Sequence, residues 1–134
     1  MTTGVFADTS FFVAFLNPSD HLHVLARRFM INRPGRLVTT SWIVVELGNY
    51  VCKTTQRTRF VSFVAALRSD PMIDIVPADE DLLSEGLALD ARRSDKEWSV
   101  TDCISFVVMS RHGLTEALTA DRHFDQAGFN ALMR

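Results

Sequence analysis

Four acidic residues stand out because each follows or interrupts an otherwise apolar segment: Asp8, Glu46, Asp102 and Asp121. If these carboxylates come together, protons or a bound cation must neutralise their repulsion. Oxygen ligands without histidine or cysteine nearby favour Mg²⁺ or Mn²⁺ over zinc. Such a cation orients and deprotonates water and neutralises phosphate, so the chemistry indicated is hydrolysis of a phosphodiester.

The positions of the acids favour a shared site. Asp8 directly follows the apolar run 5–7, and Asp121 follows the run 117–120, as expected for residues at the carboxyl ends of two strands. Glu46 lies in a helical pattern whose neighbours are nearly all apolar, where an unpaired charge is costly to bury. Asp102 opens another helical pattern and can point back to the same strand ends.

Each acid also has a purely structural interpretation. Asp8 can cap the helix that follows it, and Asp102 can be a first-turn acid that stabilises the helix dipole. Asp121 can form only an Asx turn, and Glu46 can extend to solvent or pair with an arginine. Of the four, Glu46 is the hardest to explain in this way.

The elements that must position these acids alternate along the chain. Helical periodicity is found at 11–16, 21–30, 41–52 with Ser41 as N-cap, 59–67, 79–92 and 101–112. Strands are expected at 5–7, 36–39, 72–76 and 117–119, with a weaker one at 128–132. This alternation predicts a three-layer α/β/α sandwich around a mostly parallel sheet.

Length and composition fit one globular domain over residues 1–134, with 47% hydrophobic and 22% charged residues. The apolar runs are too short to cross a bilayer, and the first residues lack a secretory signal, so a cytoplasmic location is expected. The net charge of -2 provides no general attraction to nucleic acid. Binding of a polyanion would therefore depend on local arginines and bound cations.

Four sequence blocks resemble the motifs of PIN-domain nucleases, and among them the VapC-like toxins of type II toxin-antitoxin systems. The blocks are Asp8-Thr9-Ser10, then Thr40-Ser41 with Glu46, then the stretch 95–105, and finally the stretch 118–124. The last two are the more specific, and together the blocks cover nearly the whole chain in the expected order.

The resemblance implies a metal-dependent endoribonuclease that uses Mg²⁺ or Mn²⁺ and leaves a 5′-phosphate. The metal-binding and catalytic acids would be Asp8, Glu46, Asp102 and Asp121, supported by hydrogen bonds from Ser10 and Thr101. It further implies a five-stranded sheet of order 3-2-1-4-5, a homodimer, a cognate antitoxin, and a structured RNA substrate such as tRNA or rRNA.

Secondary candidates have smaller expected roles. Arg122 is expected to contact substrate, whereas Asp95 and Asp125 are either outer-sphere groups or solvated loop residues. His123 alone among the histidines can approach the substrate, although packing or surface hydrogen bonding is its more ordinary role. Two competing functions remain: a phosphatase or receiver domain with Asp8 as phosphoryl acceptor, and an idle protein-binding module.

Overall fold

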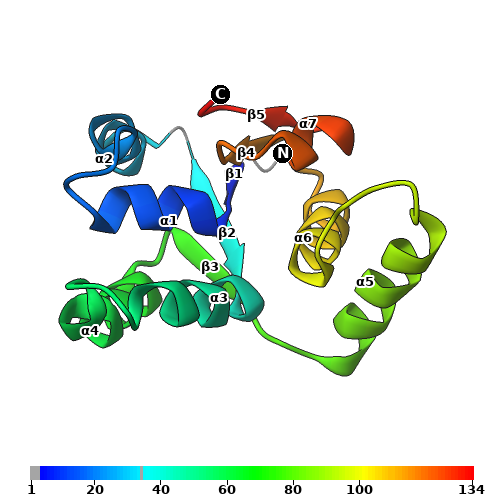
Figure 1. Cartoon of the computed structure of the whole chain (residues 1–134), viewed down its shortest axis with the longest axis horizontal. Helices are drawn as coiled ribbons and strands as arrows, with labels where there is room; N and C mark the ends of the chain where they lie inside the picture. Colours follow the sequence, from blue (N-terminus) through cyan, green and yellow to red (C-terminus); the bar gives the residue numbers. More distant parts are fainter. Residues whose placement is uncertain (1–3, 34) are drawn as a thin grey trace.

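The computed structural model describes residues 4–33 and 35–134, and its centre is a five-stranded sheet of order β3-β2-β1-β4-β5 (Figure 1). All four strand pairings are parallel. The predicted parallel sheet and its order are therefore confirmed. The strands are β1 Gly4–Ala7, β2 Arg36–Thr40, β3 Ile73–Val76, β4 Glu116–Leu118 and β5 Asn130–Ala131.

Helices cover both sides of the sheet, which confirms the three-layer architecture. They are α1 Thr9–Leu16, α2 His23–Ile31, α3 Ser41–Val51, α4 Arg57–Ser69, α5 Glu80–Arg92, α6 Val100–Arg111 and α7 Arg122–Gln126. Helices α1 to α4 pack on one another, and α5 packs on α6 at the other side (Figure 1). Among the helices in the described ranges, none has the length and apolar character that a membrane crossing requires.

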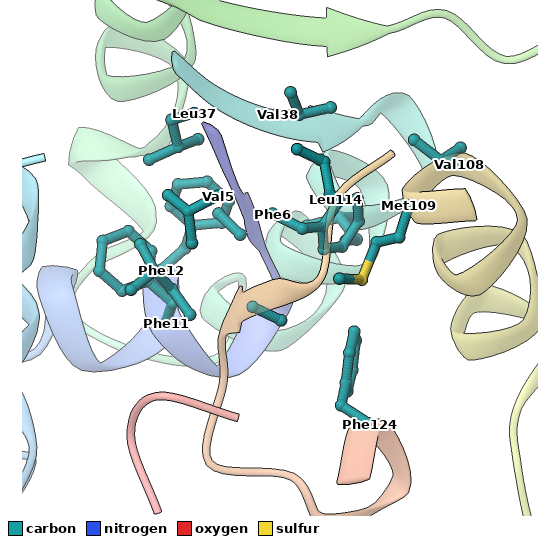
Figure 2. Close-up of a cluster of buried hydrophobic side chains, with 14 of the residues drawn as sticks. Val5, Phe6, Phe11, Phe12, Leu37, Val38, Val108, Met109, Leu114 and Phe124 are labelled. Atoms are coloured by element: carbon teal, nitrogen blue, oxygen red, sulfur yellow. The ribbon is translucent and has the colours of Figure 1, made fainter. Parts of the chain in front are cut away.

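The core explains why the central strands are apolar without alternation. Figure 2 shows Val5 and Leu37 directed to the side of Phe11, whereas Phe6 points to the side of Met109. Successive side chains of a strand point to opposite faces, so a strand covered on both faces needs apolar residues at every position. Each of these side chains is at most 2% exposed.

Helix caps fix the backbone of the segments that lie at the carboxyl edge of the sheet. The expected N-cap of α3, Ser41, is wrong by one residue: Thr40 occupies that position, and its hydroxyl accepts from the Ile43 N–H at 3.1 Å. Ser99 and Asp102 form a reciprocal capping box at the start of α6. Asp121 caps α7, a short helix that the sequence pattern does not predict.

Candidate active site

The carboxyl ends of β1 and β4 open onto one cavity of about 540 Å³. All four predicted acids line this cavity: Asp8, Glu46, Asp102 and Asp121. Asp8 follows β1 directly, Glu46 comes from α3 beyond β2, and Asp102 comes from the first turn of α6. Parallel strand order thus gathers side chains that are far apart in the sequence.

Asp8 is the most buried of the four acids, with 5% of its surface exposed. Its Oδ2 accepts a 2.9 Å hydrogen bond from the Thr119 hydroxyl and a 3.2 Å bond from the Ser10 hydroxyl. Burial raises the pKa of Asp8 to about 6, and the nearby charges of Asp102 and Glu46 also raise it. The Thr119 hydrogen bond lowers this pKa, but burial outweighs it.

Ser10 lies where a supporting residue is expected. Its Oγ is 3.2 Å from Thr119 Oγ1 and accepts from the Ala120 N–H at 3.3 Å. Thr119 Oγ1 also accepts from the Asp121 N–H at 3.0 Å, so the hydroxyls join the ends of β1 and β4. Thr101 differs from expectation, because the hydrogen bond it forms uses its backbone carbonyl, which accepts from Ser105 at 2.9 Å.

Asp102 and Asp121 form the tightest group of potential ligands together with His123. One ligand atom from each of the three lies within 4.8 Å of the others. His123 Nδ1 is 3.1 Å from Asp102 Oδ2 and 3.4 Å from Asp121 Oδ1. The expectation of oxygen ligands without a nearby histidine is therefore wrong, because α7 turns His123 back toward the acids.

Burial also raises the pKa of Asp102 above its ordinary value. The Ser99 N–H and His123 hydrogen bonds lower it, while the charge of Asp121 adds to the increase. Two neighbouring acids, Asp8 and Asp102, are thus both poorly suited to carry a negative charge alone. A bound cation would relieve both, and the carboxylate-rich donor set fits a hard divalent ion.

Glu46 lies on the same cavity but outside the tight ligand group. Its Oε1 accepts a hydrogen bond from the Thr9 hydroxyl, so α1 and α3 both contribute to its position. Its charge reaches Asp8, whose pKa it raises. Glu46 therefore belongs to the acidic site electrostatically and is oriented by a side chain from α1.

Three of the acids have a structural role in addition to their place in the site. Asp102 completes the capping box of α6, and Asp121 accepts from the His123 N–H as the N-cap of α7. Glu46 holds the Thr9 hydroxyl. Asp8 occupies the N-cap position of α1, but its Oδ2 accepts from the hydroxyls of Thr119 and Ser10 instead of from a backbone N–H of that helix. Capping and site formation are therefore compatible.

The secondary candidates lie at the margin. Arg122 is exposed at the first position of α7 and does not line the cavity. Asp95 is held by Arg93 through bonds of 3.0 and 3.1 Å. Asp125 contacts Arg134 at 3.2 Å and accepts from the Ala131 N–H at 3.3 Å. Asp95 and Asp125 thus act in local structure.

Sequence reasoning missed two hydroxyls and undervalued one imidazole: Thr9, Thr119 and His123. Thr9 is part of the first block and Thr119 of the last, so both stood beside a predicted acid. Their partners are 37 and 111 residues away, a pairing that only the sheet order reveals. His123 becomes visible as a site residue only when α7 is known.

Comparisons with known proteins agree with this geometry. The family model described as "PIN domain" matches residues 5–130. The chain is 28% identical over 125 residues to the 23S rRNA-specific endonuclease VapC20 of Mycobacterium tuberculosis, covering 93% of this chain and 95% of that protein.

Solved structures show the same fold. The crystal structure of M. tuberculosis VapC20, described as a sarcin-ricin loop cleaving toxin, has a TM-score of 0.85 at 27% identity, covering 93% of this chain and 95% of that one. FitAcB from Neisseria gonorrhoeae has a TM-score of 0.62 at 19% identity, covering 95% and 94%. With the family model matching nearly the whole chain, and with this sheet order, the chain belongs to the PIN domain family.

Proposed function

We propose that this chain is a divalent-metal-dependent endoribonuclease, the toxin of a VapC-type toxin-antitoxin pair. The observation that carries the proposal is the convergence of four acids on one cavity at the carboxyl edge of a PIN-domain sheet. The similarity to VapC20 along 93% of the chain supports the reaction class. A single nuclease domain over residues 1–134 and a cytoplasmic location belong to the same proposal.

Asp8, Glu46, Asp102 and Asp121 are the residues that would hold the cation. Buried Asp8 fits this role because its ordinary partners are two neutral hydroxyls, which do not compensate a negative charge fully. When bound, Mg²⁺ or Mn²⁺ supplies Lewis-acid activation of water and neutralisation of the scissile phosphate. Oxygen ligands are compatible with either ion.

The chain's own residues orient the reactants. Ser10 and Thr119 fix one carboxylate oxygen of Asp8, and Thr9 fixes one of Glu46. Asp102 and Asp121 are fixed by the first turns of α6 and α7. This preorganisation holds the acids in place before substrate binds, so little reorganisation is needed during reaction. Arg122, exposed beside Asp121, is our proposed contact to a substrate phosphate.

The substrate class is structured RNA, with ribosomal RNA ahead of tRNA. VapC20 is named a 23S rRNA-specific endonuclease and a sarcin-ricin loop cleaving toxin. The similarity covers 93% of this chain and 95% of VapC20, which supports a substrate of the same class. We therefore take the sarcin-ricin loop as the first substrate to test, with cleavage that leaves a 5′-phosphate.

A cognate antitoxin and a second copy of the chain are the proposed protein partners. Exposed apolar side chains on α3 and α4, namely Val45, Tyr50 and Val61, are 56 to 76% exposed and suit a protein interface. The phosphoryl-acceptor alternative is disfavoured, because Asp8 is buried and its Oδ2 already accepts two hydroxyls. The idle-module alternative does not explain the buried, raised-pKa acids.

The test is cleavage of a sarcin-ricin RNA and of a tRNA by purified protein in Mg²⁺, in Mn²⁺ and in EDTA, with RNA ends mapped. Asp8→Asn and Asp121→Asn should each lose activity by orders of magnitude and keep the folded circular dichroism spectrum. Asp81→Asn, which changes an exposed acid in the first turn of α5, is the matched control and should cleave normally. Metal-independent cleavage, or full activity of both site variants, contradicts the proposal.

A further inference from the structure

The position of His123 depends on two local features of α7. Asp121 caps this helix and accepts from the His123 N–H at 2.9 Å, which fixes the backbone beside the acids. The next residue, Phe124, is fully buried, with its ring centroid 4.9 Å from that of Phe106. The residue two before His123 caps the helix and the residue after it is anchored in the core. Together they fix the backbone of α7 so that the imidazole lines the cavity.

The imidazole is surrounded as a ligand would be. Its side chain is 20% exposed, and Nδ1 faces oxygens of two acids, Asp102 at 3.1 Å and Asp121 at 3.4 Å. Asp102, Asp121 and His123 each offer one ligand atom, and these three atoms all lie within 4.8 Å of one another, so a divalent ion can bind between them.

We infer that His123 is a nitrogen ligand of the divalent cation and that it gives the site a preference for Mn²⁺ over Mg²⁺. The inference rests on the proposed metal-dependent function. Imidazole suits first-row transition ions, whereas Mg²⁺ strongly prefers oxygen. Ligation through Nδ1 places the ring proton on Nε2. The set Asp102, Asp121 and His123 is then a mixed oxygen and nitrogen site beside Asp8.

The test uses untagged full-length protein loaded with Mn²⁺ and electron spin-echo envelope modulation, which detects nitrogen bonded to the ion. Wild type should show a histidine ¹⁴N coupling that is replaced by a ¹⁵N coupling when only histidine is ¹⁵N-labelled. His123→Asn should lose the coupling, although its amide can still donate a hydrogen bond to Asp102. His112→Asn, which changes an exposed histidine at the end of α6, should keep it.

Metal titrations provide a second measurement. His123→Asn should weaken Mn²⁺ binding by about tenfold or more and Mg²⁺ binding by much less, reducing the Mn²⁺/Mg²⁺ affinity ratio. Mn²⁺ bound by wild type without histidine nitrogen coupling, or an unchanged ratio in the variant, overturns the role of His123 and leaves the metal-dependent nuclease intact. Failure of wild type to bind either ion overturns the proposed function itself, and His123 as a ligand with it.

Discussion

The Thr119 hydroxyl donates a 2.9 Å hydrogen bond to Oδ2 of Asp8, which links the residues that follow β4 and β1 across 111 positions of sequence. Thr119 is fully buried and Asp8 is 5% exposed, so water cannot replace either partner easily. The same hydroxyl accepts from the Asp121 N–H. One buried side chain therefore orients two of the four acids.

Replacing Thr119 with valine removes this donor and keeps the side-chain volume. We expect divalent-metal affinity to fall by about ten- to a hundredfold, the usual effect of losing a group that orients a metal ligand. RNA cleavage should fall with it. Unfolding free energy should drop by about 1 to 3 kcal/mol, because Asp8 loses a buried partner. Calorimetric titration with Mn²⁺ and urea denaturation measure the two effects.

Thr39→Val is the matched control for this variant. Thr39 is also fully buried, and its hydroxyl donates a 2.9 Å hydrogen bond to the Ala7 carbonyl rather than to an acid. Its loss should lower stability by about 1 kcal/mol and leave metal affinity unchanged. If Thr39→Val weakened metal binding as much as Thr119→Val, general loosening of the sheet edge would explain both results.

The raised pKa of Asp8 has a defined consequence for stability against pH. Burial raises this pKa from 3.8 to about 6, so the folded metal-free protein holds the proton more tightly than the unfolded chain. The stability contributed by Asp8 is complete below about pH 4 and is lost as pH rises through about pH 6. Roughly two pK units correspond to about 3 kcal/mol as an upper bound.

Asp8→Asn should therefore be more stable than wild type near neutral pH in EDTA, and the two proteins should converge below about pH 4. Urea denaturation at each pH gives the unfolding free energy of both proteins. Subtracting one from the other removes the contributions of the other titrating groups, which the two proteins share. Mn²⁺ affinity of wild type should rise over the same interval, since the cation displaces the proton. Parallel stability profiles for the two proteins would show that Asp8 titrates normally.

The sheet and the gathering of the four acids at one of its edges could be predicted from the sequence because both depend on strong local signals. Apolar runs such as that before Asp8 mark strands buried on both faces, and parallel order places the residues after them at one edge. Helices α1 to α6 have enough apolar periodicity to be seen from sequence. Their boundaries shift by small amounts, as with α4, which begins at Arg57 rather than at residue 59.

The missed features depend on tertiary contacts. Helix α7 has five residues and one buried apolar side chain, Phe124, so no periodicity can be read from it. Its existence depends on the Asp121 cap and on burial of Phe124 against Phe106. Thr119 resembles an ordinary strand residue until β4 is placed beside β1. Thr101 was expected to support the site through a hydrogen bond. The bond that it forms with Ser105 uses its backbone carbonyl, which accepts from the Ser105 hydroxyl.

Phe124 should affect both the stability of the fold and the affinity of the site for Mn²⁺. Its ring packs on Phe106 and lies 6.2 Å from that of Phe6, so Phe124→Ala should lower unfolding free energy by about 3 to 5 kcal/mol. The milder Phe124→Leu should leave the protein folded and weaken Mn²⁺ binding by loosening α7. Phe129→Leu is the comparison, because Phe129 also packs on Phe106 but lies outside α7. If both leucine variants lost the same Mn²⁺ affinity, the position of α7 would have no specific role in metal binding.

The charges of Asp102 and Glu46 should differ in how strongly they raise the pKa of Asp8. Both raise the pKa of Asp8, and Asp102 has the larger effect. Neutralising either residue should therefore lower that pKa, with Asp102→Asn producing the larger change. The amide variants are suitable because each introduced amide oxygen can still accept the hydrogen bond that the carboxylate accepts, from the Ser99 N–H in Asp102→Asn and from the Thr9 hydroxyl in Glu46→Gln. Helix caps and packing are then retained while one charge is removed.

An NMR titration of the Asp8 carboxyl carbon in EDTA measures this directly in wild type and in the two variants. The midpoint should be highest in wild type, lower in Glu46→Gln and lowest in Asp102→Asn. Because the interaction between charges weakens with distance and with solvent between them, only acids that share one cavity can produce this ranking. Midpoints that stay at the wild-type value in both variants would mean that the carboxylates are electrostatically separate, and a shared cation could then not be held between them.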